Sequence, residues 1–195
     1  MRRWTLAALA LCACASETPP SDPGRRVLTP YPRAYGPGDP QWTPQPHRDR
    51  PLRVAVTPDG TRALVTLQGL EDDAGQSIAV VDLDAHRVLR RITVGASPTG
   101  VAVHPGGRFA VVTTRFENRA RVVDLVTARV VAAVPVDFYA TDVTFTPDGA
   151  HAWITNRWRN EVLRWDVDVR GDVFTVTDAR AQALPVATHP RDVAV

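Results

Sequence analysis

One segment of this sequence recurs at a nearly constant spacing, and this periodicity limits the folds that the chain can adopt. Residues 54–60 read Val-Ala-Val-Thr-Pro-Asp-Gly, and related segments follow at 101–107 and 143–149. A further copy begins with Val-Ala-Val at 193–195. Self-similarity at a period of roughly 42 residues is typical of repeat architectures, in which a unit buries its apolar face only against its neighbours.

Each unit contains four short strand patterns. The first has apolar residues at alternate positions and ends in Pro-Asp-Gly or a related turn, in which glycine supplies a positive φ. Second strands are expected at 63–66, 110–113 and 152–155, and third strands at 78–82, 120–124 and 162–166. A fourth strand, such as 88–94, leads into the next unit. Four antiparallel strands without helical periodicity predict a propeller blade.

The predicted fold class is therefore all-β, an incomplete β-propeller built of four-stranded antiparallel blades. We expect three blades, at about 51–97, 98–139 and 140–189, and the first strand of a fourth at 190–195. Three blades do not close a ring, which needs about four to eight. Because the outer faces of the end blades then stay open, we expect this sequence to be the first part of a longer protein, or else a short product completed by self-association.

The loops of the units differ in length, while one aspartate recurs in all of them. Asp82, Asp124 and Asp166 end the third strands, and we expect them to accept hydrogen bonds from the following turn. An insertion at 67–77 lengthens the loop between the second and third strands of the first unit. Arg-Gly-Asp at 170–172 is a turn signal that predicts an extended outer hairpin in the third.

The third unit carries a motif that points to a known repeat. Residues 153–156 read Trp-Ile-Thr-Asn, and Asn118 and Asn160 each stand six residues before the recurring aspartate. These features resemble the YVTN family of β-propeller repeats, although Leu67 and Thr114 replace the motif's asparagine in the other units. The resemblance covers about residues 51–195, implies a ring of usually seven blades, and says almost nothing about function.

The N-terminus predicts export. Residues 1–13 combine a short basic start with an apolar run too short to span a bilayer, as in a signal peptide. Leu11-Cys12-Ala13-Cys14 resembles a bacterial lipobox, in which Cys14 is the better acceptor because small Ala13 precedes it. The alternative is an ordinary cleaved signal peptide with incidental cysteines. By analogy with enteric bacteria, the absence of aspartate after Cys14 favours the outer membrane, on its periplasmic side or at the cell surface.

Residues 14–50 form a predicted tether. Ten of the 17 prolines of the chain lie between residues 15 and 51, with little apolar alternation between them. Proline-rich segments are extended and semi-rigid, so this one is expected to hold the folded part away from the lipid surface.

Composition excludes several kinds of chemistry. Both cysteines lie within the first 14 residues, so the folded part has no disulfide, thiol nucleophile or cysteine-ligated metal. The chain has no lysine, because all 23 of its basic residues are arginine, and this rules out Schiff-base catalysis and a P-loop. Without the signal peptide the chain is formally neutral, and with no basic stripe we expect no nucleic-acid partner.

The candidate binding residues lie in loops between second and third strands, on the face where propellers usually bind ligands. Arginine-flanked aromatic residues occupy corresponding places in two units, and such groups can stack on and pair with an anionic or aromatic ligand. The alternative is that they seal neighbouring blades. The candidates are Arg115, Phe116, Asn118, Asn156, Arg157, Trp158 and Asn160.

Other polar groups give weaker signals. Glu71-Asp72-Asp73 offers oxygen ligands for calcium, but consecutive carboxylates on a loop are more often a solvated tip. His104 stands where the other units have threonine, which predicts a turn residue, and His189 is a weak candidate for a metal or haem ligand. No serine-hydrolase elbow is present. We therefore predict no catalytic residues, no metal and no cofactor.

Two functions remain. The favoured one is a membrane-anchored binding or scaffold module of the cell envelope, with a protein or small-molecule ligand on the loop face. The alternative is the propeller part of an enzyme, because propellers of the resembled kind are similar to lactonases and to haem domains of periplasmic reductases, and some are joined to dihaem cytochrome c peroxidase-like domains. Downstream sequence with haem-attachment motifs would favour the enzyme.

Overall fold

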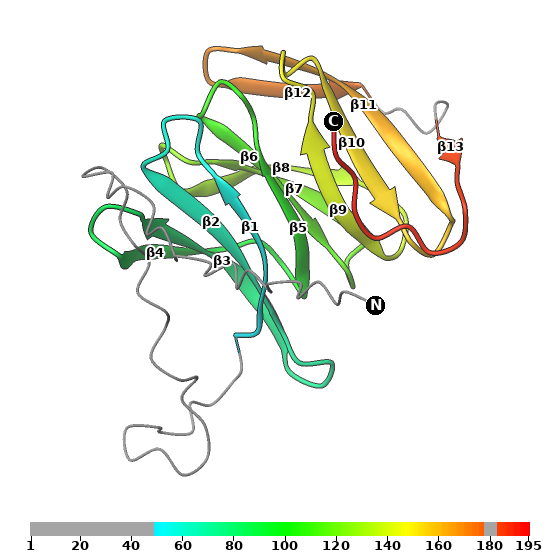
Figure 1. Cartoon of the computed structure of the whole chain (residues 1–195), viewed down its shortest axis with the longest axis horizontal. Coiled ribbons are helices and arrows are strands. Elements are labelled where there is room, and N and C mark those ends of the chain that lie inside the picture. The colour runs from blue at the N-terminus through cyan, green and yellow to red at the C-terminus, as the bar shows by residue number, and fades with distance from the viewer. Residues whose placement is uncertain (1–48, 178–182) are drawn as a thin grey trace, which may run out of the picture. The chain divides into compact units, whose positions relative to one another are not determined.

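The computed structural model describes residues 49–177 and 183–195 (Figure 1). The predicted signal peptide (1–13), the lipidation site Cys14 and the tether up to residue 48 lie outside the described residues. Asp49 already contacts the first sheet, because its carboxylate accepts two hydrogen bonds from Arg91 at 2.8 and 2.6 Å. Within the described ranges, no helix long and apolar enough to cross a membrane is found.

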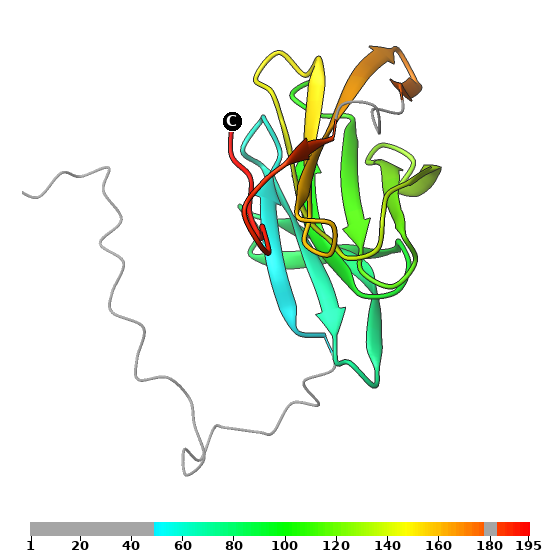
Figure 2. The ribbon, with the colours of Figure 1, turned by 90° about the vertical axis from the view of Figure 1, so that its right-hand side faces the viewer.

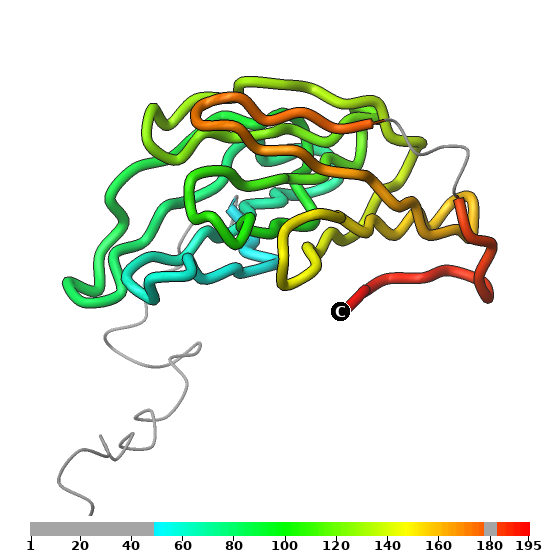
Figure 3. Tube along the Cα trace, turned by 90° about the horizontal axis from the view of Figure 1, so that it is seen from above, coloured from blue at the N-terminus to red at the C-terminus, as the bar shows by residue number. Residues whose placement is uncertain are grey.

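The described chain is all-β and forms three antiparallel meanders, which confirms the predicted propeller blades (Figure 1). Their order can be followed along the trace in Figure 3. The first blade comprises β1 (Pro51–Val56), β2 (Arg62–Gly69), β3 (Ala74–Asp82) and β4 (Arg87–Thr93). The second comprises β5 (Pro98–Val103), β6 (Phe109–Thr114), β7 (Arg119–Asp124) and β8 (Arg129–Pro135). The third comprises β9 (Ala140–Phe145), β10 (His151–Asn156), β11 (Glu161–Arg170), β12 (Val173–Thr177) and β13 (Leu184–Pro185).

The turn between first and second strands is the same in all blades. In the first blade, the Gly60 N–H donates to the Thr57 carbonyl at 2.8 Å, and Gly60 has a φ of +71°. The Asp59 carboxylate accepts from the Thr57 hydroxyl at 2.6 Å and from the Thr61 N–H at 3.1 Å. The glycine of the motif therefore has the predicted positive φ, and the aspartate, present in the first and third blades, adds side-chain hydrogen bonds that close the turn.

The recurring aspartate closes the outer hairpin in two blades but not in the third. Asp82 accepts hydrogen bonds from the N–H groups of residues 84 and 85, and Asp124 does so from residues 126 and 127. Asp166 instead contacts His151 at 2.9 Å, because β11 continues past it to Arg170. The structural role predicted for these aspartates is thus correct for two of them.

The insertion in the third blade splits its outer edge. Residues 171 and 172 form the predicted turn, and β12 pairs with the far half of β11. The short strand β13 pairs with the near half, at Glu161 and Val162. In the first blade, much of the insertion lengthens β2 and β3 themselves, so that the loop at the tip spans residues 70–73.

The apolar core consists of the layers between blades. Strand β6 is buried at all six positions and divides its side chains between the two layers by alternation. Phe109 and Val111 pack with Trp165 and Ile154 of the third blade. Ala110 and Val112 belong to the layer shared with the first blade, which includes Leu64 and Ile78 of β2 and β3. The middle blade is therefore stabilised from both sides.

The first blade leaves one face uncovered. Val101 of β5 is 6% exposed and Val143 of β9 is 3% exposed, because a preceding blade packs against each strand. The corresponding Val54 of β1 is 63% exposed, and Val56 is 53% exposed. The same sequence pattern is thus buried in two blades and open to water in the first.

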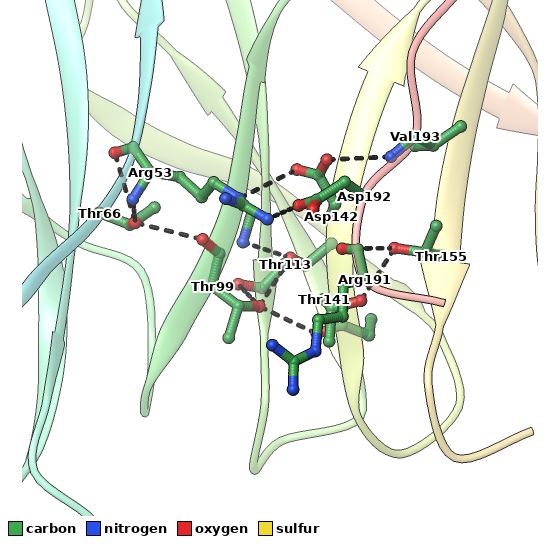
Figure 4. A network of polar contacts seen from close by, with 12 residues as sticks. Arg53, Thr66, Thr99, Thr113, Thr141, Asp142, Thr155, Arg191, Asp192 and Val193 are labelled. Atoms are coloured by element: carbon green, nitrogen blue, oxygen red, sulfur yellow. Dashed lines mark hydrogen bonds and ion pairs between the residues drawn. The ribbon is translucent and has the colours of Figure 1, made fainter. Parts of the chain in front are cut away.

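Threonines of the second strands tie neighbouring blades together near their innermost strands (Figure 4). The innermost strands carry a register shift, which leaves a backbone N–H outside the ladder. The Thr66 hydroxyl accepts the N–H of Arg53 at 2.9 Å and donates to the Thr99 carbonyl of the next blade at 3.2 Å. Buried Thr113 accepts the N–H of Gly100 at 2.8 Å and contacts the Thr99 hydroxyl.

The segment 190–195 takes the place of a fourth innermost strand. The Thr155 hydroxyl, which corresponds to Thr66 and Thr113, donates to the Arg191 carbonyl at 3.4 Å, and the Val193 N–H donates to Asp142 at 3.3 Å. The segment runs beside β9 and near β1, as the red trace in Figure 2 shows. The segment thus lies where a fourth innermost strand is predicted, although residues 190–195 form no strand.

The first prediction concerns the threonine ties. Thr113→Val keeps the shape of the side chain but leaves the Gly100 N–H without its acceptor, so we expect a loss of about 1–3 kcal/mol in the free energy of unfolding. Urea denaturation followed by circular dichroism measures it. Thr127→Val, on an exposed hairpin, is the control, and equal stability of the two variants would contradict the assigned role.

His104 packs between the second and third blades. Its ring packs edge-on against Phe145 at 5.3 Å between centroids and against Phe174 at 6.2 Å, and its Nδ1 accepts the N–H of Gly106. Burial among these groups lowers the pKa of His104 below its usual value near 6.5, although a hydrogen bond with the Gly149 backbone opposes the shift. The predicted turn role is thus combined with packing between blades.

The second prediction follows from this depressed pKa. As the pH falls below about 6.5, the unfolded chain binds a proton at this histidine more readily than the folded chain, so stability present at neutral pH is lost. His104→Thr, the residue of the other units, should therefore reduce the loss of stability between about pH 7 and 5. Thermal melts across this range measure it, with exposed His86→Asn as control. Parallel pH profiles for wild type and His104→Thr would count against this assignment.

Candidate functional site

The predicted loop face is built from turns that are tied to the innermost strands. The Arg115 N–H donates to the Ser97 carbonyl at 2.9 Å, and the Arg157 N–H donates to the Tyr139 carbonyl at 3.1 Å. Ser97 and Tyr139 have positive φ angles of 54° and 70° and come directly before β5 and just before β9. The repeat thus places Arg115 and Arg157 at equivalent positions of neighbouring blades, as the sequence predicts.

Both arginines lie against one aromatic ring. The guanidinium carbon of Arg115 lies 4.2 Å from the centroid of Tyr139, and that of Arg157 lies 5.6 Å from the same ring. Arg115 also lies 5.0 Å from the ring of Phe116 and 3.3 Å from the carboxylate of Glu71 in the first blade. Arg115 therefore contacts side chains of all three blades.

These side chains border a cavity of about 350 Å³ beside the innermost strands. Thr99 of β5, Thr141 of β9 and Leu52 of β1 contribute to its wall. Its charged lining consists of four arginines and one aspartate: Arg53, Arg115, Arg157, Arg191 and Asp192. Such a lining gives the cavity a positive potential, which attracts anions.

One position of the innermost strands carries a charged residue in three of the four copies. It is Arg53 in β1, Asp142 in β9 and Asp192 in the last segment, whereas β5 has Gly100 there. The guanidinium of Arg53 forms an ion pair with Asp192 and lies 3.8 Å from Asp142 (Figure 4). Burial raises the pKa of Asp142, while hydrogen bonds from backbone N–H groups, including that of Val193, and the charge of Arg53 oppose this shift.

Gly100 is required by the close approach of β5 to β9. A Cβ atom at this position would lie 2.7 Å from the Cα of Asp142 and 2.9 Å from the hydroxyl of Thr113. Both neighbours are held in place, one as backbone and the other within the threonine tie. The glycine therefore lets the innermost strands of the second and third blades approach each other closely beside the cavity.

The other two predicted aromatic residues are on the rim. Trp158 is 71% exposed and stacks edge-to-face on Phe138, with 5.8 Å between the ring centroids. Phe116 is 40% exposed and borders a second, adjoining cavity of about 400 Å³ together with Glu71 and Arg115. The structure thus brings Arg115 and Arg157 to the cavity, whereas Phe116 and Trp158 are not part of its lining.

The predicted asparagines serve the turns. Fully buried Asn156 accepts hydrogen bonds through Oδ1 from the N–H groups of Trp158 and Arg159, at 3.1 and 3.0 Å. Asn160 has a φ of 55°, and its Oδ1 accepts the N–H of His189 at 2.8 Å. Asn118 has a φ of 53°, which asparagine tolerates better than most residues. The Oδ1 atoms of Asn156 and Asn160 therefore serve the turns, whereas the buried Nδ2 of Asn156 has no hydrogen-bond partner in the described chain.

Two arginines of the cavity, Arg53 and Arg191, were not among the residues that the sequence singled out. Arg53 and Arg191 lie within or beside the apolar start of an innermost strand, and Tyr139 comes directly before one. A charged residue next to the apolar valine of such a strand could have indicated the site, because side chains of a strand alternate between its two faces. Aligning the four copies on Val54, Val101, Val143 and Val193 would have revealed it.

The acidic loop at residues 71–73 is the weaker candidate for a calcium site. Glu71 is 81% exposed and faces Arg115, and the described residues contain no group of three or more histidine, cysteine or carboxylate side chains placed to hold a metal. Cys14, the predicted lipidation site, lies outside the described residues.

Comparison with solved structures supports the fold. Hydrazine synthase of Kuenenia stuttgartiensis matches with a TM-score of 0.62 and 21% identity, over 81% of this chain and 41% of that chain. A functionally unknown protein from Desulfotomaculum acetoxidans matches with a TM-score of 0.59 and 19% identity, over 72% and 43%. A protein of Bacteroides fragilis provisionally assigned as a 6-phosphogluconolactonase matches with a TM-score of 0.62 and 12% identity, over 73% and 41%.

These likenesses define the class of protein as a β-propeller-type fold. No protein-family model matches the sequence, and a search of curated proteins finds no match. At identities of 12–21%, the solved structures bear on the fold alone. The chain spans between 41% and 43% of the length of these three structures.

Proposed function

We propose that this chain is an exported, lipid-anchored β-propeller protein that acts as a binding module of the cell envelope. The observation that carries the binding role is the convergence of Arg115 and Arg157 on Tyr139 at a cavity of about 350 Å³. Cavities of this size with a few convergent polar groups are the usual form of small-ligand sites.

The chemistry of the cavity favours binding over catalysis. Its charged groups are arginines, which donate hydrogen bonds and stay protonated, and Asp192, which forms an ion pair with Arg53. General acid–base or nucleophilic catalysis needs a group that gives up or accepts a proton near neutral pH. Among the cavity residues that the structure describes, none has this character.

The repeat type forms part of the proposal. The chain is a propeller of YVTN-type repeats, and the threonine and asparagine of the motif make contacts within the blade and to the next segment. Thr155 ties its blade to the next segment, and Asn156 closes the turn after β10. These contacts support the assignment, because each depends on a residue type that the motif specifies.

The proposed location of the protein in the cell envelope rests on its N-terminal sequence. In the proposed mature form, acylated Cys14 holds the propeller at the outer membrane, and the proline-rich segment 15–50 separates it from the lipid. A short acyl anchor and an extended tether leave the loop face accessible to ligands in the envelope.

The third prediction tests the anchor. Cys14→Ser should abolish metabolic labelling with a radioactive fatty acid and release the protein from the membrane fraction, because the serine hydroxyl cannot form the thioether of a diacylated cysteine. Cys12→Ser is the matched control and should keep both. Unchanged labelling of Cys14→Ser would remove the anchor from the proposal.

The fourth prediction concerns the open face of the first blade. We propose that a second copy covers the exposed side chains of Val54 and Val56 when no other blade does, because burial of apolar surface favours association. The full chain in a density-matched detergent should sediment as an oligomer. Val54→Thr combined with Val56→Thr should shift it toward the monomer, whereas Val131→Thr on exposed β8 should not. A monomeric wild type would refute this association.

A further inference from the structure

In the cavity of about 350 Å³ that Arg115 and Arg157 border, three of the four arginines carry charge that is not balanced by a buried carboxylate. Arg53 forms an ion pair with Asp192 and lies near Asp142, so its charge is balanced. Neither Arg157 nor Arg191 takes part in any ion pair of the described chain. Arg115 has one, Glu71, at 3.3 Å, but that carboxylate is 81% exposed, and exposed ion pairs are weak. Arg115, Arg157 and Arg191 are therefore available to an incoming anion.

Two of these arginines are held in position before any ligand arrives. The guanidinium groups of Arg115 and Arg157 both lie against the ring of Tyr139, and one Nη atom of Arg115 also contacts the exposed carboxylate of Glu71. The Nε atom of Arg115 is buried and has no hydrogen-bond partner in the described chain. A buried donor without an acceptor is costly, and an acceptor supplied by a ligand would remove that cost.

The third arginine comes from the next segment of chain. Arg191 is exposed, and its backbone carbonyl is held by the Thr155 hydroxyl. Figure 4 shows its guanidinium group extending away from the threonine ties, without an ion pair. Arg191 thus adds a donor from a third direction to the pair on Tyr139, all bordering a single cavity.

We propose that this cavity binds a small organic polyanion through carboxylate or phosphate groups. Arg115 and Arg157 form the fixed part of the site, with Tyr139 as their support, and Arg191 closes on the ligand. A planar guanidinium matches both oxyanions by paired hydrogen bonds. At about 350 Å³ the cavity admits a compact molecule rather than a polymer. The inference rests on the proposed function, since it names the ligand class of the same loop face.

The opposite face offers a weaker alternative. A cavity of about 420 Å³ lies near the Pro-Asp-Gly turns and includes Arg62, Arg90 and Arg108. Arg108 is already paired with buried Asp124 at 2.9 Å, and Asp59 contributes a negative charge to the lining. Leucine, valine and proline side chains supply much of the remaining wall. This cavity therefore has less uncompensated positive charge to offer an anion.

The fifth prediction tests the site by isothermal titration calorimetry of the full chain in detergent with citrate, pyrophosphate and acetate. Citrate or pyrophosphate should bind, acetate should bind at least tenfold more weakly, and added salt should lower the affinity. Arg157→Gln and Arg191→Gln should each weaken binding about tenfold or more. Arg129→Gln, on the exposed outer strand β8, removes the same charge elsewhere and should leave affinity unchanged.

The outcomes separate the ligand class from the binding role. Preference for citrate identifies a carboxylate ligand, and preference for pyrophosphate identifies a phosphate ligand. Absence of binding by both anions would overturn the inference, whereas the proposed anchor fails only if fatty-acid labelling persists in Cys14→Ser. Binding that is lost in Arg62→Gln but kept in Arg191→Gln would also overturn it, by placing the anion at the opposite face. Arg191 is exposed, so its substitution tests the site without endangering the fold.

Discussion

The burial of each blade between its neighbours is the interaction on which the rest of this structure depends. A single meander of four strands has two faces, and in the middle blade both faces are apolar because β6 alternates side chains between two layers. Stability is therefore shared between adjacent units, as in other repeat architectures. Val54 and Val56 show what happens without a neighbour: they are exposed because no preceding blade covers them, whereas Val101 and Val143 are buried.

Close packing of the blades brings their innermost strands together. Backbone N–H groups and charged side chains meet there, and each needs a partner. The register shifts of these strands release backbone N–H groups, which Thr66 and Thr113 of the second strands accept, and the hydroxyls of Thr66 and Thr99 donate to carbonyls of the next blade. Arg53 and the carboxylates of Asp142 and Asp192 meet in the same zone. The cavity lies beside this network, and Arg53 and Asp192 belong to both.

The two interpretations of the arginine-bearing turns are compatible. Arg115 joins three blades through Tyr139, Phe116 and Glu71, so it does seal neighbouring units. The same contacts hold its guanidinium in one place, and a donor that is already oriented loses less freedom when it binds an anion. A residue that stabilises the arrangement of blades thus also prepares a binding site.

The repeat period, the glycines of the turns and the alternation of apolar residues were enough to predict the blades, because these features act within one unit. Among the candidate site residues, the sequence placed Arg115 and Arg157 at corresponding positions of two loops, where Asn156 and Asn160 also accept backbone N–H groups. Only the tertiary structure decided that Tyr139, Arg53 and Arg191 join the two arginines at one cavity. The physical reason is that these side chains come from different blades, and their meeting depends on how neighbouring sheets pack, which no local pattern encodes.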